Sequence, residues 1–105
     1  MSKKENAKTV KVVIECKTDC EMCKVTIDGE RIYCNRKTTL ELIKGKTYEL
    51  EWTVMGQEGC EYSLKILEPH YLIWEITRKL DSSGKDTGHH YIEVPVSDEE
   101  KKNEM

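Results

Sequence analysis

The stretch Thr47–Met55 reads Thr-Tyr-Glu-Leu-Glu-Trp-Thr-Val-Met, and it decides the class of the fold. Its apolar residues occupy every second position from Tyr48 to Val54, with threonine and glutamate between them. Successive side chains of a β-strand point to opposite faces, so this spacing gathers the apolar groups on one face. A helix would scatter the same groups around its surface. The stretch is therefore predicted to be a strand with one buried face and one face in water.

The same alternation recurs through most of the chain. It covers the segments 10–16, 23–27, 32–34, 40–42, 62–66, 72–76 and 92–96. Turn signals separate these segments at Asp28-Gly29, Lys44-Gly45, Gly56 to Gly59, Pro69 and a polar loop from Asp81 to Gly88. About eight short strands with such spacing are typical of an all-β antiparallel β-sandwich. We expect Ig-like or jelly-roll connectivity, although the pattern does not say which strands pair.

The length of 105 residues fits a single domain. Residues 1–8 and 97–105 hold almost no apolar side chains, so they cannot bury enough surface to offset the entropy of ordering. We therefore expect a disordered N-terminal tail, a single β-sandwich domain over 9–96, and a disordered, charged C-terminal tail.

The charge and the cysteine count limit the possible partners and location. Seventeen basic against twenty acidic residues give a net charge of −3, whereas nucleic-acid-binding proteins usually carry a basic field. The sequence contains no run of about eighteen apolar residues, which is the length needed to span a membrane. Its first residues also lack the apolar segment of a secretory signal. Five cysteines, an odd number, favour a reducing compartment in which thiols persist. We expect a cytoplasmic protein without nucleic-acid or membrane partners.

Four of the cysteines form a cluster in the sequence. The spacing Cys20-Glu-Met-Cys23 lets two thiolates reach one zinc ion, and Cys16 and Cys34 could complete its four ligands. A second Cys-x-x-Cys pair is missing, and the alternation places Cys16, Cys23 and Cys34 on inward faces, where cysteine behaves as a small apolar residue. Buried thiols and no cofactor are therefore the first expectation. A zinc site made of Cys16, Cys20, Cys23 and Cys34 is the alternative.

The large aromatic residues divide into two groups. Trp52 and Trp74 lie in phase with the apolar faces of their strands, so we expect both in the core. Tyr33, Tyr71 and Tyr91 lie out of phase, so we expect them on the surface. Exposed tyrosines give rigid contact area at a low entropy cost, which suits a protein partner or a carbohydrate.

No arrangement of residues predicts catalysis. His89 and His90 are neighbours beside the last strand, so their side chains point to opposite faces and cannot both bind one metal ion without a bulge. Nucleophilic catalysis needs a cysteine or serine beside a general base, and no spacing selects such a pair from Cys34, Cys60 and His89. An enzyme is not expected.

One part of the chain resembles a known type of domain. The run Val25-Thr-Ile-Asp-Gly-Glu is followed by Thr38-Thr-Leu-Glu-Leu-Ile-Lys-Gly-Lys-Thr-Tyr-Glu-Leu-Glu-Trp. With this order of strand, Asp-Gly, Leu-x-Leu strand, Gly turn and long alternating strand, residues 23–56 resemble small bacterial β-sandwich repeats of the PEGA type. They also resemble carboxypeptidase-regulatory-like domains. The proline that precedes the Leu-x-Leu strand in those families is missing here. The resemblance implies an accessory binding or spacer module without catalytic residues.

These observations together predict a non-catalytic accessory module that binds a protein partner through its surface. A zinc-stabilised domain and a carbohydrate or small-ligand binder are the alternatives. Open sandwiches leave unpaired edge strands, so a small homo-oligomer formed by edge pairing is also open.

Overall fold

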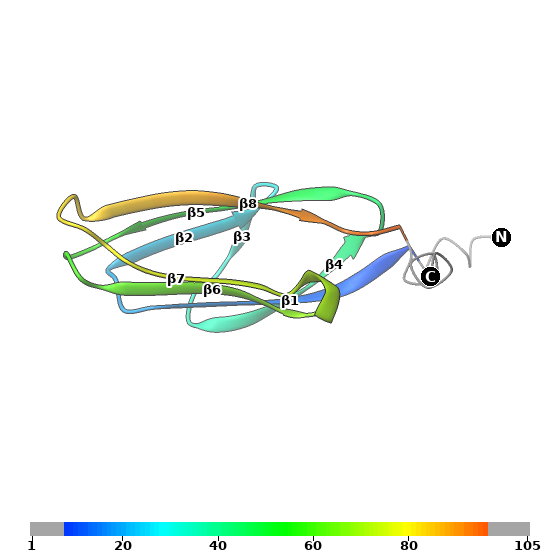
Figure 1. The fold of residues 1–105 in the computed structure, drawn as a ribbon, viewed down its shortest axis with the longest axis horizontal. Helices are drawn as coiled ribbons and strands as arrows, with labels where there is room; N and C mark the ends of the chain where they lie inside the picture. The colour runs from blue at the N-terminus through cyan, green and yellow to red at the C-terminus, as the bar shows by residue number, and fades with distance from the viewer. Residues whose placement is uncertain (1–7, 97–105) are drawn as a thin grey trace.

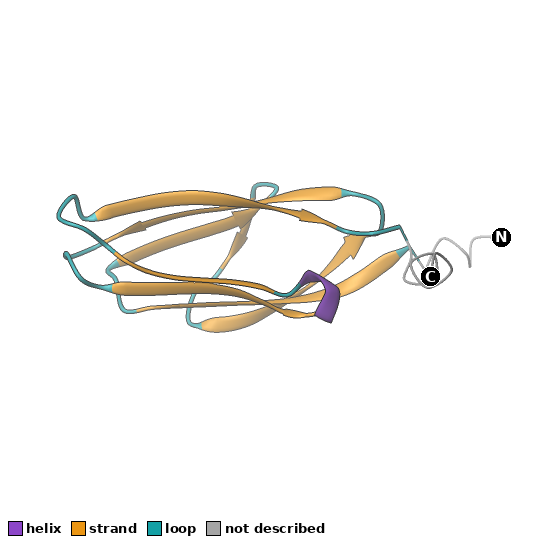
Figure 2. Cartoon of the chain, in the orientation of Figure 1, coloured by secondary structure: helices purple, strands orange, loops and turns teal. Residues whose placement is uncertain are grey.

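Eight antiparallel strands make up the computed structural model, which describes residues 8–96 (Figure 1). They are β1 (Thr9–Thr18), β2 (Met22–Ile27), β3 (Glu30–Ile32), β4 (Arg36–Ile43), β5 (Thr47–Met55), β6 (Glu61–Glu68), β7 (Trp74–Lys79) and β8 (Lys85–Glu93). A 3-10 turn, η1 (His70–Leu72), is the only helical segment in this range (Figure 2). No helix within it is long and apolar enough to cross a membrane. The tails predicted at 1–8 and 97–105 fall outside the described residues, apart from Lys8.

The strands form two four-stranded sheets that pack face to face, as predicted for a β-sandwich. One sheet has the order β4-β1-β6-β7 and the other the order β3-β2-β5-β8. Figure 1 shows β2, β5 and β8 in one layer and β1, β6 and β7 in the other. Only β2–β3 and β6–β7 are successive strands within one sheet, so most connections among the described residues cross between the layers. The strands β3, β4, β7 and β8 form the sheet edges.

The core lies between the sheets and consists of the side chains that the alternation directs inward. Its fully buried members include Ile14, Val25, Leu50, Leu64 and Ile92. Burying one such side chain contributes about 1.5–3 kcal/mol. Trp52 is 4% exposed, as predicted for a core residue, whereas Trp74 on the edge strand β7 is only half-buried. No charged residue is buried within residues 8–96.

The turn at Asp28-Gly29 confirms the hairpin predicted between β2 and β3. Both residues have positive φ, 47° and 86°, which the tight turns of antiparallel hairpins require. The Asp28 carboxylate accepts a hydrogen bond from the backbone N–H of Glu49 at 2.8 Å. The turn is thereby attached to β5, the neighbour of β2 in the sheet.

The segment predicted as a polar loop through Gly88 is shorter than expected, because β8 begins at Lys85. Gly88 lies opposite Trp52 in the β5–β8 ladder. A Cβ atom at Gly88 would lie 2.4 Å from Cζ2 of the indole, so only glycine leaves room for the ring. The strand therefore continues through a residue that sequence reasoning assigns to a loop. The strand predicted at 72–76 begins only at Trp74, because Leu72 belongs to η1 after Pro69. The strand predicted at 92–96 ends at Glu93, before Pro95.

Candidate functional site

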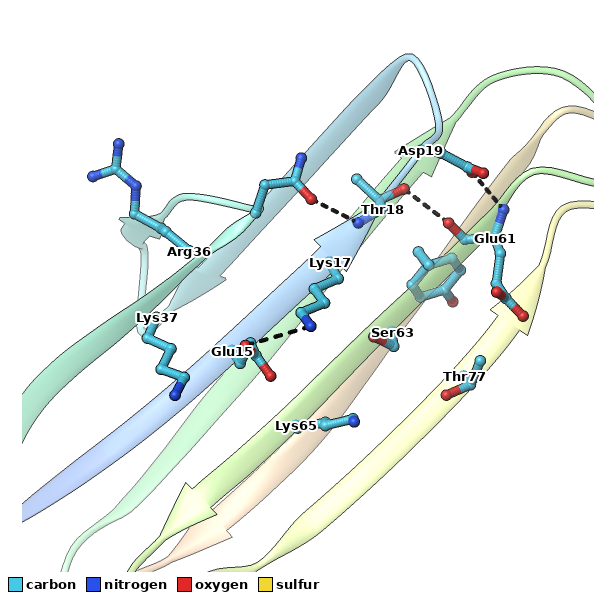
Figure 3. Close-up of a pocket in the computed structure, with 12 residues that line it drawn as sticks. Glu15, Lys17, Thr18, Asp19, Arg36, Lys37, Glu61, Ser63, Lys65 and Thr77 are labelled. Carbon is cyan, nitrogen blue, oxygen red and sulfur yellow. Dashed lines mark hydrogen bonds and ion pairs between the residues drawn. The ribbon is translucent and has the colours of Figure 1, made fainter.

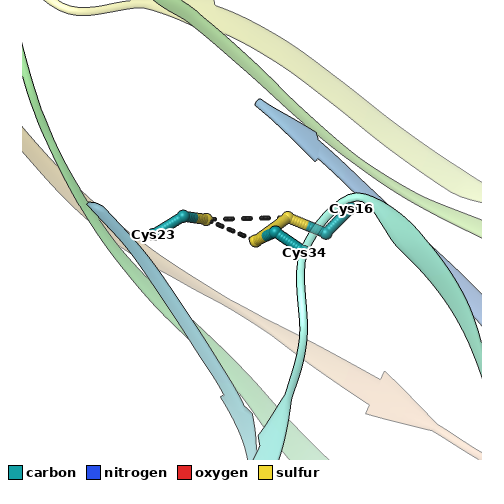
Figure 4. A group of neighbouring side chains, drawn as sticks. All are labelled: Cys16, Cys23 and Cys34. Carbon is teal, nitrogen blue, oxygen red and sulfur yellow. Dashed lines mark hydrogen bonds between the residues drawn. A yellow bond between two sulfur atoms is a disulfide. The ribbon is translucent and has the colours of Figure 1, made fainter. Parts of the chain in front are cut away.

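Three cysteines meet inside the sandwich (Figure 4). Cys16 lies near the end of β1, Cys23 lies on β2, and Cys34 lies in the connection between β3 and β4. Cys16 and Cys34 form a disulfide. The sulfur of Cys23 lies 2.7 Å from the Cys34 sulfur and 3.6 Å from the Cys16 sulfur. Cys16 is fully buried, whereas Cys23 and Cys34 are half-buried.

Strand register explains why these residues converge. The β2–β3 ladder pairs Val25 with Ile32, and both side chains are buried between the sheets. Continuing the same antiparallel register by two residues places Cys23 opposite Cys34 on the same inner face. Cys16 follows Val12 and Ile14 on the inner face of β1. It therefore meets Cys23 and Cys34 from the other sheet.

The fourth predicted zinc ligand lies elsewhere. Cys20, in the turn after β1, forms a disulfide with Cys60, in the turn before β6. Asp19 holds the two turns together, since its carboxylate accepts a hydrogen bond from the backbone N–H of Glu61 at 2.9 Å. The structure thus brings Cys16, Cys23 and Cys34 together and separates Cys20 from them.

Four of the five cysteines are therefore paired, whereas the sequence favoured free thiols. Cys60 lies 40 residues from Cys20, and no local pattern connects them. Cys23 is the free cysteine among the described residues. Burial raises the pKa of the Cys23 thiol to about 11, although the nearby charge of Arg31 opposes this effect. The Cys23 thiol is accordingly protonated at neutral pH.

The three tyrosines predicted as contact residues lie in three separate places. Tyr33 follows β3 at one edge of its sheet and is 54% exposed, and Tyr91 lies on β8 at the opposite edge of that sheet and is 53% exposed. Tyr71 is half-buried in η1, where its ring meets the His70 ring at 5.5 Å between centroids. They do not form one surface. Carbohydrate binding through these tyrosines stays a prediction.

Tyr33 has a distinctive setting. The guanidinium groups of Arg31 and Arg36 lie 5.4 Å and 5.6 Å from the centre of its ring. A cation within about 6 Å of an aromatic ring is attracted to its face. Tyr33 is thus a rigid aromatic group flanked by positive charge.

Arg36 also lines a hollow of about 630 Å³ on the outer face of the β4-β1-β6-β7 sheet (Figure 3). Side chains of β1, β4, β6 and β7 surround this hollow, and they are mostly charged or hydroxylic. Its cations are Lys17, Arg36, Lys37 and Lys65, and its carboxylates are Glu15, Asp19 and Glu61. The Lys17 ammonium lies 3.9 Å from the Glu15 carboxylate. Arg36, Lys37 and Lys65 form no ion pair with any residue in the described range 8–96.

A second hollow of about 850 Å³ lies on the outer face of the other sheet. Lys24, Arg31, Glu51 and His89 contribute its charged and titratable side chains. His89 already pairs with Glu49, at 3.1 Å between Nδ1 and the carboxylate oxygen. This hollow is larger than the first, but it offers fewer cations.

A chain of hydrogen bonds joins the two sheets between β5, β6 and β8. The indole N–H of Trp52 donates to the Tyr62 hydroxyl at 3.0 Å, and that hydroxyl donates to the Asp86 carboxylate at 2.6 Å. Burial and the hydrogen bond to Asp86 raise the pKa of Tyr62 to about 12. Every polar group in this network of three side chains has a hydrogen-bond partner, as buried polar groups require.

His90 is more enclosed than the sequence suggests. It points inward from β8 and stacks on Trp74, with 4.0 Å between the ring centroids. Burial lowers the pKa of His90, which favours the neutral ring. His89, its neighbour, is exposed on the opposite face, as the alternation requires.

Comparison with known proteins does not extend this picture. The chain matches none of the protein-family models, curated proteins or solved structures with which we compared it. The resemblance of residues 23–56 to PEGA-type and carboxypeptidase-regulatory-like domains stays a prediction.

Proposed function

We propose that the chain is a non-catalytic binding module that holds an acidic segment of a protein partner on the outer face of the β4-β1-β6-β7 sheet. The observation that carries this proposal is the hollow with Arg36, Lys37 and Lys65, three cations that form no ion pair among residues 8–96, although Glu15 lies opposite both lysines in the ladders. Tyr33 does not line the hollow, but its ring lies beside Arg36 and supplies apolar contact area next to that side chain.

The chemistry of the hollow favours carboxylates presented along an extended chain. Each exposed ion pair contributes only about 0.2–1 kcal/mol, so several have to act together. Ser63 and Thr77 add hydroxyl groups that can donate to a partner's backbone carbonyls. Glu15 repels a misplaced acidic group, which helps to fix the position of the partner. Binding of this kind is weak to moderate and weakens as salt is added.

This role corresponds to an accessory module that acts through its surface and needs no cofactor. The cytoplasmic location stays a prediction. Homo-oligomer formation through the free edge strands likewise stays a prediction.

The experiment selects binding peptides from a displayed random library and then measures their affinity for matched variants. Lys37→Glu with Lys65→Glu reverses two charges in the hollow, and Lys24→Glu with Lys85→Glu makes the same change on the other sheet. We expect the selected peptides to be rich in Asp and Glu. Their affinity should fall at least about tenfold in the first variant and less than about twofold in the control. Peptides without acidic enrichment, or equal losses in both variants, would contradict the proposal.

A zinc-stabilised domain is the second candidate, and the cysteine cluster is the observation that favours it. The sulfur atoms of Cys16, Cys23 and Cys34 all lie within 4.8 Å of one another, close enough for one ion with Zn–S distances of about 2.3 Å. Zinc would require the Cys16–Cys34 disulfide to be reduced and a fourth ligand other than Cys20. Protein purified under reducing conditions should then hold one equivalent of zinc and unfold on chelation. Metal-free protein with two intact disulfides would contradict this candidate.

A further inference from the structure

We infer that Cys16, Cys23 and Cys34 form a thiol–disulfide exchange site, in which Cys34 bonds either to Cys16 or to Cys23. The three residues come from β1, from β2 and from the connection between β3 and β4, and they meet between the sheets (Figure 4). This inference does not depend on the hollow or on any partner.

The Cys23 sulfur is in contact with the disulfide between Cys16 and Cys34. A disulfide rearranges when a neighbouring sulfur attacks one of its two sulfur atoms. The Cys23 sulfur lies 2.7 Å from the Cys34 sulfur, so no other atom fits between them. It lies 3.6 Å from the Cys16 sulfur. Cys34 is therefore the nearer of the two disulfide sulfurs, and a side-chain rotation has to bring the Cys23 sulfur into line with the bond between Cys34 and Cys16 before it can attack.

The strand register, which does not depend on the side-chain positions, also brings Cys23 and Cys34 together. The ladder that pairs Val25 with Ile32 places Cys23 directly opposite Cys34 when it is continued by two residues. Directly opposite residues of antiparallel strands have Cα atoms about 4.5–5.5 Å apart, within the span of about 4.4–6.8 Å that disulfides bridge. The existing pair, Cys16 and Cys34, has a Cα separation of 4.6 Å. A bond between Cys23 and Cys34 thus suits the register of β2 and β3, whose ladder ends at the Val25–Ile32 pair.

The reaction is balanced within the protein. The Cys23 thiol loses its proton, and its sulfur forms a bond to the Cys34 sulfur while the bond between Cys34 and Cys16 breaks. The electron pair of the broken bond stays on the Cys16 sulfur, which takes up a proton. One disulfide and one thiol are present before and after, so no oxidant or reductant is consumed.

The two isomers connect different parts of the fold. A bond between Cys16 and Cys34 joins β1 of one sheet to the segment after β3 of the other, whereas a bond between Cys23 and Cys34 stays beside β2 and β3. Asn35 follows Cys34 directly, donates from its backbone N–H to the Cys16 carbonyl at 2.5 Å and lines the hollow. A change of disulfide partner at Cys34 is therefore expected to shift Asn35 and so to alter the edge of the hollow. Only this last consequence rests on the proposed function.

The test on the wild-type protein is to identify which cysteine is free. The protein is unfolded in denaturant with excess maleimide at mildly acidic pH, so that the free thiol is blocked before the disulfides rearrange. Peptide mapping by mass spectrometry then locates the label. We expect label on Cys23 in some molecules and on Cys16 in at least a few per cent of the others. Label on Cys23 alone, in protein that has been incubated for days, would overturn the inference.

Two variants separate exchange from misfolding. Cys16→Ser should still form two disulfides, one between Cys20 and Cys60 and the other between Cys23 and Cys34. Cys23→Ser should form only the bond between Cys16 and Cys34 in place of the mixture. A Cys16→Ser protein that is folded by circular dichroism but leaves Cys23 and Cys34 both open to alkylation would also overturn the inference. If the wild-type protein shows this exchange but selects no acidic peptides, only the proposed function is contradicted.

Discussion

Replacing Gly88 by alanine should destabilise the domain, although glycine is usually the weaker residue inside a strand. The new methyl group would come within 2.4 Å of Cζ2 and 2.7 Å of Cε2 of Trp52, so the indole or β8 has to move. Overpacking of this kind costs about 1–3 kcal/mol. Moving the indole also weakens its hydrogen bond to Tyr62, which contributes about 0.5–1.5 kcal/mol. Alanine returns about 0.5–1 kcal/mol of backbone entropy, which leaves an expected net loss of about 0.5–4 kcal/mol.

Urea unfolding measures this loss as a lower midpoint at unchanged slope. Thr87→Ala, at the exposed neighbouring position, is the control and should stay within about 0.5 kcal/mol of wild type. Adding Trp52→Phe tests the cause, because a phenyl ring lacks the indole atoms that the methyl group meets. The double variant should lose less stability than the sum of the two single losses, by about 0.5–3 kcal/mol. Wild-type stability in Gly88→Ala, or strict additivity, would refute the reasoning.

Three further perturbations test the polar groups between the sheets and the second disulfide. Tyr62→Phe should cost about 1–3 kcal/mol in urea unfolding, because it leaves the Asp86 carboxylate without its donor at 2.6 Å; an unchanged midpoint would show that this bond contributes nothing. Burial and the hydrogen bond to Asp86 raise the pKa of Tyr62 from 10.0 to about 12, so the folded state holds this proton more tightly than the unfolded chain. The associated stability should be complete below pH 10.0 and disappear as the pH rises toward 12, which ultraviolet titration of tyrosinate and unfolding at each pH would check. Burial lowers the pKa of His90 below 6.5, so the unfolded chain takes up the proton first and stability should fall as the pH drops below 6.5. His90→Gln should lose that part of the pH dependence, and an identical profile in the variant would assign it to another group. Replacing Cys20 and Cys60 by serine should cost about 4 kcal/mol, since their bond closes a loop of 40 residues in the unfolded chain; calorimetry showing a small change would contradict the loop-closure argument.

The sequence predicts the strands of this fold more completely than their partners. The alternation within 47–55 and 62–66 is visible because each inward residue there is apolar. The turn at Asp28-Gly29 is visible because it needs residues that accept positive φ. Both signals are local. The turn at Lys44-Gly45, in contrast, joins β4 and β5 in different sheets, and no local pattern distinguishes such a crossing from a hairpin.

The beginning of β8 shows why part of the fold escapes a local pattern. Its inward positions hold Asp86 and Gly88, which look like loop residues in the sequence. Asp86 is needed there by Tyr62 on β6, and Gly88 is needed by Trp52 on β5. The reasons for both residues therefore lie on strands distant in the sequence.

The candidate site was predictable to a similar extent. Alternation placed Cys16, Cys23 and Cys34 on inward faces, and the structure brings all three together. The pairing of Cys20 with Cys60 depends on two turns that meet only in the folded protein. The hollow beside Arg36 is likewise formed by four strands of one sheet, so no single segment of the sequence indicates it.

The bond between Cys20 and Cys60 also sets how this domain would respond to mechanical tension. The strands β2, β3, β4 and β5 lie between the two cysteines, so a force applied to the chain ends passes across the sulfur atoms and bypasses them. A segment of 40 residues would measure roughly 140 Å when fully stretched. While the bond is intact, this segment does not contribute to the extension measured between the chain ends. Reducing this bond would release the part of the segment after Cys34, which holds β4 and β5, whereas the bond between Cys16 and Cys34 would still keep β2 and β3 out of the path of the force.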